Sequence, residues 1–179
     1  MRKLTNLTML LGAVALTACA SNGGTTTSAS NLNVVEKVAI NAPASKVWAK
    51  VANFGDLGAF HPAVAKTEIQ SGKNNTVGAV RLLTLQDGGT VNETLTSYSD
   101  ENMRYAYVIN ESVLPVSNYS ANIQVKSLGA AKSEVVWTAQ FKRKDLSEKP
   151  AKGQDDKAGK DTIHAVFKGG LENLKKITE

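Results

Sequence analysis

Few of the residues that commonly carry chemistry occur in this sequence. It has one cysteine, Cys19, and two histidines, His61 and His164, in 179 residues. A single cysteine cannot close a disulfide within the chain, and the two widely separated histidines show no metal-ligand spacing. There is no glycine-rich phosphate loop and no nucleophile elbow. The sequence therefore predicts neither a disulfide scaffold nor a bound metal or other cofactor.

A strong excess of one charge is also absent. The 21 basic and 16 acidic residues leave a formal net charge of +5, and 42% of the residues are hydrophobic. These values are typical of a globular domain and too balanced for a nucleic-acid-binding protein. Basic residues gather between positions 142 and 160, where Asp145, Glu148, Asp155 and Asp156 interrupt them. This pattern favours a solvated loop over a patch for anionic lipid.

The chain lacks the run of about 20 apolar residues that a membrane-spanning helix needs. A shorter apolar run at residues 9–16 follows Arg2 and Lys3 and leads into Thr17, Ala18 and Cys19. A basic start, a short apolar run and small residues are typical of a cleavable export signal. An ordinary secretory signal followed by an incidental cysteine is the alternative.

The sequence Leu16, Thr17, Ala18, Cys19 resembles the lipobox of bacterial lipoproteins. The resemblance implies that residues 1–18 are removed and that Cys19 is acylated on its sulfur and its new amine. Two or three acyl chains anchor a protein stably, whereas one does so only marginally. Ala20 in place of Asp is similar to the pattern for delivery to the outer membrane. The resemblance thus implies a lipid-anchored protein of the cell envelope, facing the periplasm, with no free thiol for catalysis.

Residues 19–32 comprise the cysteine and the segment that follows it, whose residues are mostly small and polar, as is typical of a flexible tether. A domain at residues 33–179 follows it. Residues 34–40 alternate as a strand, and Pro43 suits the first turn of a helix that carries Val47, Trp48, Val51 and Phe54 at helical spacing. Residues 55–58 form a turn or a short second helix.

Six further strands are predicted between residues 64 and 144, because apolar and polar residues alternate there between short turns. Such strands form an antiparallel sheet with one covered face. A polar loop at 145–154 then leads to a long helix at about 155–178. Gly169 and Gly170 would cost this helix about 1–2 kcal/mol, so a close approach or a bend is expected there. The apolar stripe of the helix is Ile163, Val166, Phe167, Gly170, Leu171, Leu174 and Ile177.

This order of elements predicts an α+β fold. An antiparallel sheet of about seven strands should wrap around the long C-terminal helix, with one or two short helices after the first strand. One helix covers a broad curved sheet incompletely, so we expect a cavity between them.

Several local sequences stand out in this order of elements, at residues 42–48, 54, 60–62, 77–81, 92–95, 118–119 and 136–137. Together with the order of elements, they resemble the START-like (SRPBCC) superfamily. This is the helix-grip fold of the birch-pollen allergens, and its bacterial members are often described as polyketide cyclase/dehydrase and lipid transport proteins. The resemblance implies binding of hydrophobic small molecules, and in a minority of members the cyclisation or dehydration of polyketides.

A more distant resemblance to the plant abscisic-acid receptors concerns the cavity. It implies that loops 85–89 and 114–119 flank the cavity mouth. The receptors' ligand-binding lysine matches His61, and their pocket glutamate matches Glu93. The receptors' Ser-Gly-Leu-Pro gate sequence is missing here. Its absence excludes binding of the hormone, but the expectation of a cavity stands.

The predicted function is therefore a membrane-anchored binding protein for a hydrophobic or amphipathic small molecule. One alternative is a cyclase/dehydrase-type enzyme with His61 and Glu93 as acid and base; the other is a module that binds an envelope protein. His61 could instead cap a turn, and Glu93 could form a buried pair with Arg81 that has no role in binding. The predicted ligand-binding residues are His61, Arg81, Leu83, Leu85, Glu93, Tyr107, Tyr119, Trp137, Phe141, Val166, Phe167 and Gly170.

Overall fold

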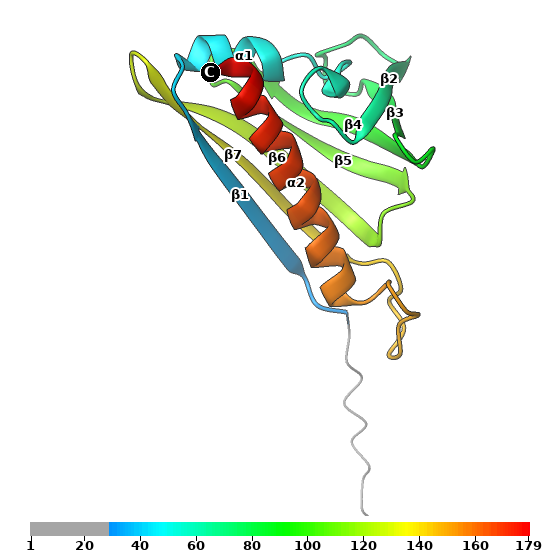
Figure 1. Cartoon of the computed structure of the whole chain (residues 1–179). Helices are drawn as coiled ribbons and strands as arrows, with labels where there is room; N and C mark the ends of the chain where they lie inside the picture. Colours follow the sequence, from blue (N-terminus) through cyan, green and yellow to red (C-terminus); the bar gives the residue numbers. More distant parts are fainter. Residues whose placement is uncertain (1–28) are drawn as a thin grey trace, which may run out of the picture.

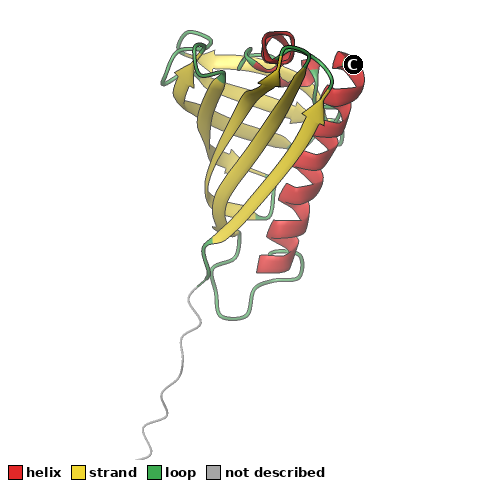
Figure 2. Cartoon of the chain, turned by 90° about the vertical axis from the view of Figure 1, so that its left-hand side faces the viewer, coloured by secondary structure: helices red, strands yellow, loops and turns green. Residues whose placement is uncertain are grey.

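A curved antiparallel sheet lies against one long helix in the computed structural model, which describes residues 29–179 (Figures 1 and 2). The predictions for the signal peptide, Cys19 and most of the tether lie outside the described residues. The elements are β1 (Leu32–Ile40), α1 (Ala44–Val51), the 3-10 turn η1 (Leu57–Ala59), β2 (Val64–Ser71), β3 (Val80–Leu85), β4 (Thr90–Ser99), β5 (Arg104–Ser112), β6 (Val116–Gly129), β7 (Lys132–Arg143) and α2 (Asp156–Thr178).

The seven strands form one sheet in the order β1-β7-β6-β5-β4-β3-β2. Strands β2 to β7 pair with their neighbours in sequence, and β1 pairs antiparallel with β7 at the far end of the chain. The pairing of β4 with β5 shifts register twice, with one extra residue in β5 opposite Asn92 and Glu93 and one in β4 between Leu95 and Ser97; such bulges bend a strand. This architecture confirms the predicted α+β helix-grip fold.

Helix α2 covers the concave face of the sheet with one side, on which buried residues recur every three or four positions. The Phe167 ring stacks on Trp137 of β7, with ring centroids 4.3 Å apart. Asp155 caps the helix by accepting a hydrogen bond from the Ala158 backbone N–H at 2.7 Å, as suits the positive end of a helix. The buried helix residues are Gly159, Ile163, Phe167, Gly170, Leu171, Leu174 and Thr178.

The prediction of the apolar stripe of α2 is wrong at one residue, Ile177. Ile177 is 42% exposed, and Thr178 is buried in its place. Position 178 follows Leu174 by four residues and Leu171 by seven, so it lies on the centre of the buried stripe. The Thr178 hydroxyl is satisfied there because it donates to the Leu174 carbonyl at 2.6 Å.

The glycine pair in α2 allows a close approach at one of its two positions. A Cβ added to Gly170 would lie 2.6 Å from His61 Cδ2 and 3.1 Å from Trp137 Cζ3. A Cβ added to Gly169 would meet nothing within 4 Å. Gly170 is therefore needed for packing, whereas Gly169 is not.

Helix α1 closes the sheet near the C-terminal end of α2 (Figure 1). Val47, Trp48 and Val51 are buried, as their spacing predicts, and the Trp48 indole N–H donates to Asp100. Pro43 stands one position before the helix, and its carbonyl accepts from the Lys46 and Val47 N–H groups. Neither α1 nor α2 has the length and apolar character to cross a membrane.

Candidate functional site

A cavity of about 70 Å³ lies between α2 and the sheet. Its floor is made by inward-facing residues of β3 to β7, and its other walls come from η1, the start of β2 and α2. Ala63, Leu85, Ile109, Leu114 and Val166 remain partly or fully exposed and form its rim. The lining residues are Leu57, His61, Ala63, Val64, Leu83, Leu85, Glu93, Tyr107, Ile109, Leu114, Tyr119, Trp137, Ile163, Val166 and Phe167.

The structure brings together nine of the twelve predicted ligand-binding residues on this wall. Three lie elsewhere. Arg81 is fully buried behind Glu93. Gly170 is covered by His61 and Trp137, and Phe141 stacks on the far side of Tyr119 toward the first turn of α2. Neighbouring side chains separate these three buried residues from the void.

Six lining residues were not predicted. Ile109 shares the parity of Tyr107 on β5, and Ile163 belongs to the helical stripe, so the pattern could have found both. Leu57, Ala63, Val64 and Leu114 come from loops or strand starts, where no periodicity indicates a direction.

The charged residue of the wall is Glu93, which forms a buried ion pair with Arg81 on the neighbouring strand. Arg81 of β3 stands opposite Glu93 of β4 in the register. Its Nε donates to Glu93 Oε2 at 2.6 Å, and its Nη2 lies 2.6 Å from the same oxygen. Its Nη1 donates to the Phe54 carbonyl at 2.7 Å, and its guanidinium lies 4.1 Å from the centre of the Phe54 ring. Within the described residues, Glu93 Oε1 receives no hydrogen bond.

Burial governs the charge of the cavity groups. Desolvation raises the pKa of the Glu93 carboxyl above its usual range, and Arg81 opposes this rise. Desolvation also raises the pKa of the Tyr107 and Tyr119 hydroxyls, so both remain protonated. The Tyr107 oxygen accepts the Trp137 indole N–H at 3.1 Å. The cavity thus offers one carboxyl oxygen and tyrosine hydroxyls in an otherwise apolar wall.

His61 is held on both sides of its ring. Its Nδ1 accepts the Ala63 backbone N–H at 3.3 Å, and its Nε2 lies 2.9 Å from the Val166 carbonyl, to which it donates. This pattern requires the neutral ring with the proton on Nε2. Both nitrogens are therefore engaged in joining the loop before β2 to α2, and neither is free to exchange a proton with a ligand.

The same geometry predicts an acid-sensitive contact. Burial lowers the pKa of His61 from its ordinary 6.5, so below pH 6.5 the unfolded chain binds a proton more readily than the folded one. The stability that neutral His61 contributes is present above pH 6.5 and is lost as the pH falls toward the lowered pKa. Thermal melts between about pH 8 and pH 5 should show this loss, and His61→Gln should reduce the slope.

The second histidine provides the control for this experiment. His164 is exposed on α2, where its Nδ1 lies 2.6 Å from Glu36 Oε1. A loss of stability in acid that persists in His164→Gln cannot come from His164. Equal slopes for wild type and His61→Gln would show that His61 does not govern the transition.

Two loops meet above the rim of the cavity. A Cβ added to Gly89, in the β3–β4 turn, would lie 2.8 Å from Val113 Cγ2, in the β5–β6 loop, and 3.6 Å from Leu85 Cδ1. The Val113 N–H also donates to the Thr90 carbonyl at 3.1 Å. These are the loops that the resemblance places at the cavity mouth, and in the structure they touch each other.

Among residues 29–179, no group of three or more histidine, cysteine, aspartate or glutamate side chains could hold a metal ion. The site is therefore described by its apolar wall, the Arg81–Glu93 pair and the tyrosines.

Comparison with protein families gives one match. The model of the family described as polyketide cyclase / dehydrase and lipid transport covers residues 31–179. No curated protein matches the sequence.

Solved structures share the fold. XoxI from Bacillus cereus is 24% identical, with a TM-score of 0.70 over 82% of this chain and 94% of that one. The Zhui aromatase/cyclase from Streptomyces sp. R1128 is 18% identical, with a TM-score of 0.65 over 83% and 94%. Ara h 8.0201 is 16% identical, with a TM-score of 0.64 over 83% and 98%. At these identities, the likeness shows the fold alone.

Proposed function

The chain belongs to the polyketide cyclase/dehydrase and lipid transport family, and from this we propose that it binds a hydrophobic or amphipathic small molecule in the cavity beneath α2. The observation that carries the proposal is the composition of the wall, which is apolar except for His61, Glu93 and the tyrosine hydroxyls. A mostly apolar pocket with few placed polar groups is the usual form of a small-molecule site.

The size of the cavity indicates how binding must proceed. Ligand pockets usually enclose about 300–1,000 Å³, whereas this cavity encloses about 70 Å³, room for a few water molecules. We therefore propose that the structure is the closed state and that binding widens the cavity at its rim. The Gly89–Val113 contact is where the two loops would part, since loops flanking a site commonly move to admit a ligand.

Binding is favoured over the enzymatic alternative by the state of His61. As an acid or base, His61 would have to give up its bond to Ala63 or to Val166. Glu93 holds its ion pair with Arg81 and presents its other oxygen without a partner among the described residues. This oxygen suits a hydrogen bond from a ligand hydroxyl or amine better than it suits a proton relay with His61.

Filling the cavity should abolish binding. Val166 lies on the rim, so Val166→Trp should place its indole in the void. Binding of N-phenyl-1-naphthylamine, an uncharged apolar fluorophore, should weaken at least about tenfold, as expected when a bulky side chain occupies a small pocket. Native mass spectrometry after mild extraction should show any co-purifying ligand on the wild type and not on the variant.

The neighbouring residue supplies a matched control. Ala165 is exposed on the same turn of α2 and does not line the cavity, so Ala165→Trp should bind the fluorophore like the wild type. Circular dichroism should show both variants folded. Unchanged binding by a folded Val166→Trp would overturn the cavity proposal in favour of a module that binds a protein partner.

We also propose that Cys19 anchors the protein by lipid in the cell envelope, at the outer membrane facing the periplasm. The support is the lipobox-like sequence ending at Cys19. Cys19→Ser should abolish labelling with radioactive palmitate and leave unprocessed precursor or released protein. Continued palmitate labelling of the variant in the membrane fraction would contradict the anchor.

A further inference from the structure

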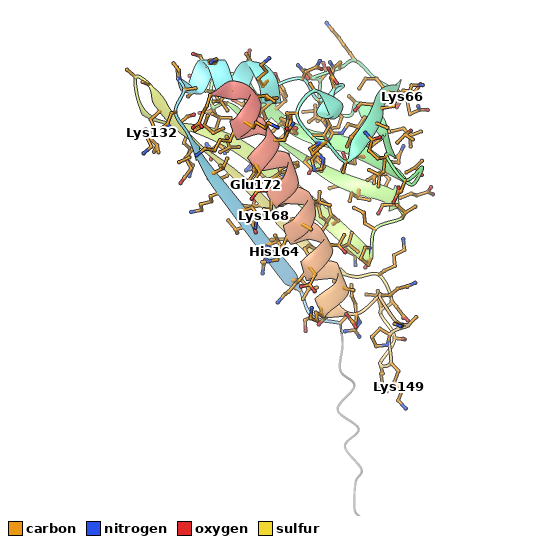
Figure 3. The ribbon with its side chains drawn as sticks, viewed as in Figure 1. Lys66, Lys132, Lys149, His164, Lys168 and Glu172 are labelled. Atoms are coloured by element: carbon orange, nitrogen blue, oxygen red, sulfur yellow. The ribbon has the colours of Figure 1, made fainter. Side chains whose placement is uncertain are left out.

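One end of the domain gathers segments that are distant in sequence. The chain enters the described structure here, beside the start of α2 and the β7–α2 loop (Figure 1). A Cβ added to Gly159, in the first turn of α2, would lie 3.2 Å from the Pro115 carbonyl oxygen and 3.8 Å from Leu32 Cδ1. We refer to residues 142–161 at this end as the basic end. Figure 3 shows Lys149 at its tip and Lys132 at the opposite end of the molecule.

The acidic side chains of the basic end are engaged by the protein itself. Asp145 accepts two backbone N–H groups of its own loop, at 2.7 and 3.0 Å. Asp155 caps α2, and Asp156 lies 3.1 Å from the buried Arg143. Asp161 pairs with a lysine one helical turn away. Only Glu148, of the five acids in this segment, makes no such contact among the described residues.

Several basic side chains at this end, in contrast, are exposed and lack such a partner. Lys149, Lys152 and Lys160 are exposed, and none forms an ion pair within the described part of the chain. Arg143 fixes the loop by donating to two loop carbonyls, each at 2.7 Å. The loop so held presents Leu146, whose side chain is 49% exposed. An outward lysine surface with an exposed leucine is suited to the headgroup layer of a membrane.

We propose that the basic end docks on an anionic phospholipid surface, with Leu146 entering the headgroup layer. This inference rests on the proposed lipid anchor. Ten positions separate Cys19 from Ala29, the first described residue, so the anchor keeps this end within about 35 Å of the bilayer. The negative surface potential falls off within a Debye length of about 8–10 Å, so the lysines meet it each time the tethered domain comes that close to the bilayer. Of the four interrupting acids, which in the sequence favour a solvated loop, three are engaged by loop N–H groups, the start of α2 or Arg143. Among the described residues, only Glu148 is left without such a contact to weaken the attraction.

Docking at this end also orients the cavity. Lys144 donates from its backbone N–H to the Pro115 carbonyl at 3.1 Å and from Nζ to the Ser112 carbonyl at 2.8 Å. The β5–β6 loop, which flanks the cavity mouth, is therefore joined directly to the basic end. A docked domain holds this loop close to the lipid headgroups, so a ligand of membrane origin has a short path to the rim.

The test uses two exposed leucines at opposite ends of the molecule. Leu146 lies at the basic end, and Leu128 is 54% exposed in the β6–β7 hairpin. Leu146→Cys and Leu128→Cys, each labelled with an environment-sensitive nitrobenzoxadiazole probe, are reconstituted as the full anchored protein. The vesicles contain phosphatidylethanolamine with phosphatidylglycerol, or phosphatidylcholine alone. We expect a blue shift of the Leu146 probe only on phosphatidylglycerol vesicles and no shift of the Leu128 probe.

Charge changes separate electrostatic docking from mere proximity. In the Leu146→Cys protein, a triple variant with Lys149→Glu, Lys152→Glu and Lys160→Glu should lose the blue shift. A double variant with Lys126→Glu and Lys132→Glu should keep it. Salt at about 1 M, where the Debye length falls to about 3 Å, should also abolish it. The docking proposal is overturned if both probes respond alike, if neither responds, or if the triple variant retains the shift.

Failure of the anchor is distinguishable from failure of the docking surface. The mass of the purified protein shows whether Cys19 carries acyl chains. If it does not, the same two probes are placed in the Cys19→Ser protein and added to preformed vesicles. A salt-sensitive response of the Leu146 probe to phosphatidylglycerol then supports the docking surface without the anchor, and no response overturns it.

Discussion

Arg81→Met should lower the free energy of unfolding by about 3–5 kcal/mol at neutral pH, because it leaves a buried carboxylate without its counter-charge. The Glu93 side chain is 5% exposed and that of Arg81 is wholly buried, so water cannot replace the lost partner. The variant also loses the hydrogen bond from Nη1 to the Phe54 carbonyl. Urea unfolding followed by circular dichroism measures the loss.

The loss should shrink in acid. Burial already raises the pKa of Glu93, and removing Arg81 raises it further. The folded variant then holds a proton that the unfolded chain releases, so its stability decreases as the pH rises from about 4.5 through the raised pKa. Below that window Glu93 is neutral in both states and needs no partner. The difference between wild type and Arg81→Met should therefore be smaller at pH 5 than at pH 7.

Removing both charges is the control. Arg81→Met with Glu93→Leu should be more stable than Arg81→Met alone, because replacing a buried ion pair by apolar groups is often close to neutral. If the double variant is no more stable than the single one, or if the loss does not depend on pH, the loss arises from packing and not from the unpaired carboxylate.

Two alanine substitutions at adjacent glycines should have opposite effects. Gly170→Ala should destabilise the domain by about 1–3 kcal/mol, because its Cβ would lie 2.6 Å from His61 Cδ2. His61 would have to move, which weakens its bond to the Val166 carbonyl. Gly169→Ala meets nothing within 4 Å and should stabilise the helix by about 0.5–1 kcal/mol through helix propensity.

Each variant serves as the control of the other, since both add one methyl group to the same helix. Chemical denaturation at pH 8, where His61 is neutral, gives the two free energies. If Gly170→Ala is as stable as Gly169→Ala, the approach of His61 to α2 contributes little to the fold, and its pairing with Val166 does not position the cavity wall.

Local alternation and spacing predicted much of the fold correctly. The period-2 residues of β2 to β7 and the stripe of α2 give the element order without any long-range information. The Arg81–Glu93 pair could also be predicted, since both residues belong to one hairpin and stand opposite each other about its turn. Glu93 shares its parity with Val91 and Leu95, which fixes its inward direction.

Contacts between distant segments could not be predicted in this way. His61 and Val166 are 105 positions apart, and their hydrogen bond depends on the missing Cβ of Gly170. The loop residues Leu57 and Leu114 reach the cavity because of how their loops fold, and no periodicity describes a loop. The size of the cavity depends on whether side chains from separate elements interlock, and a change of one methyl group alters such packing.

In the charged segment at 142–161, too, the sequence determines the composition and the tertiary structure determines the contacts. Its composition is plain in the sequence, where five acids among seven basic residues suggest mutual neutralisation. Tertiary contacts decide which of these charges have partners: backbone N–H groups, the start of α2 and the buried Arg143 engage three of the five acids, while several lysines stay exposed. Patterns of side-chain type are local and survive in the linear chain, whereas burial and the partners of a charge exist only once distant segments are packed together.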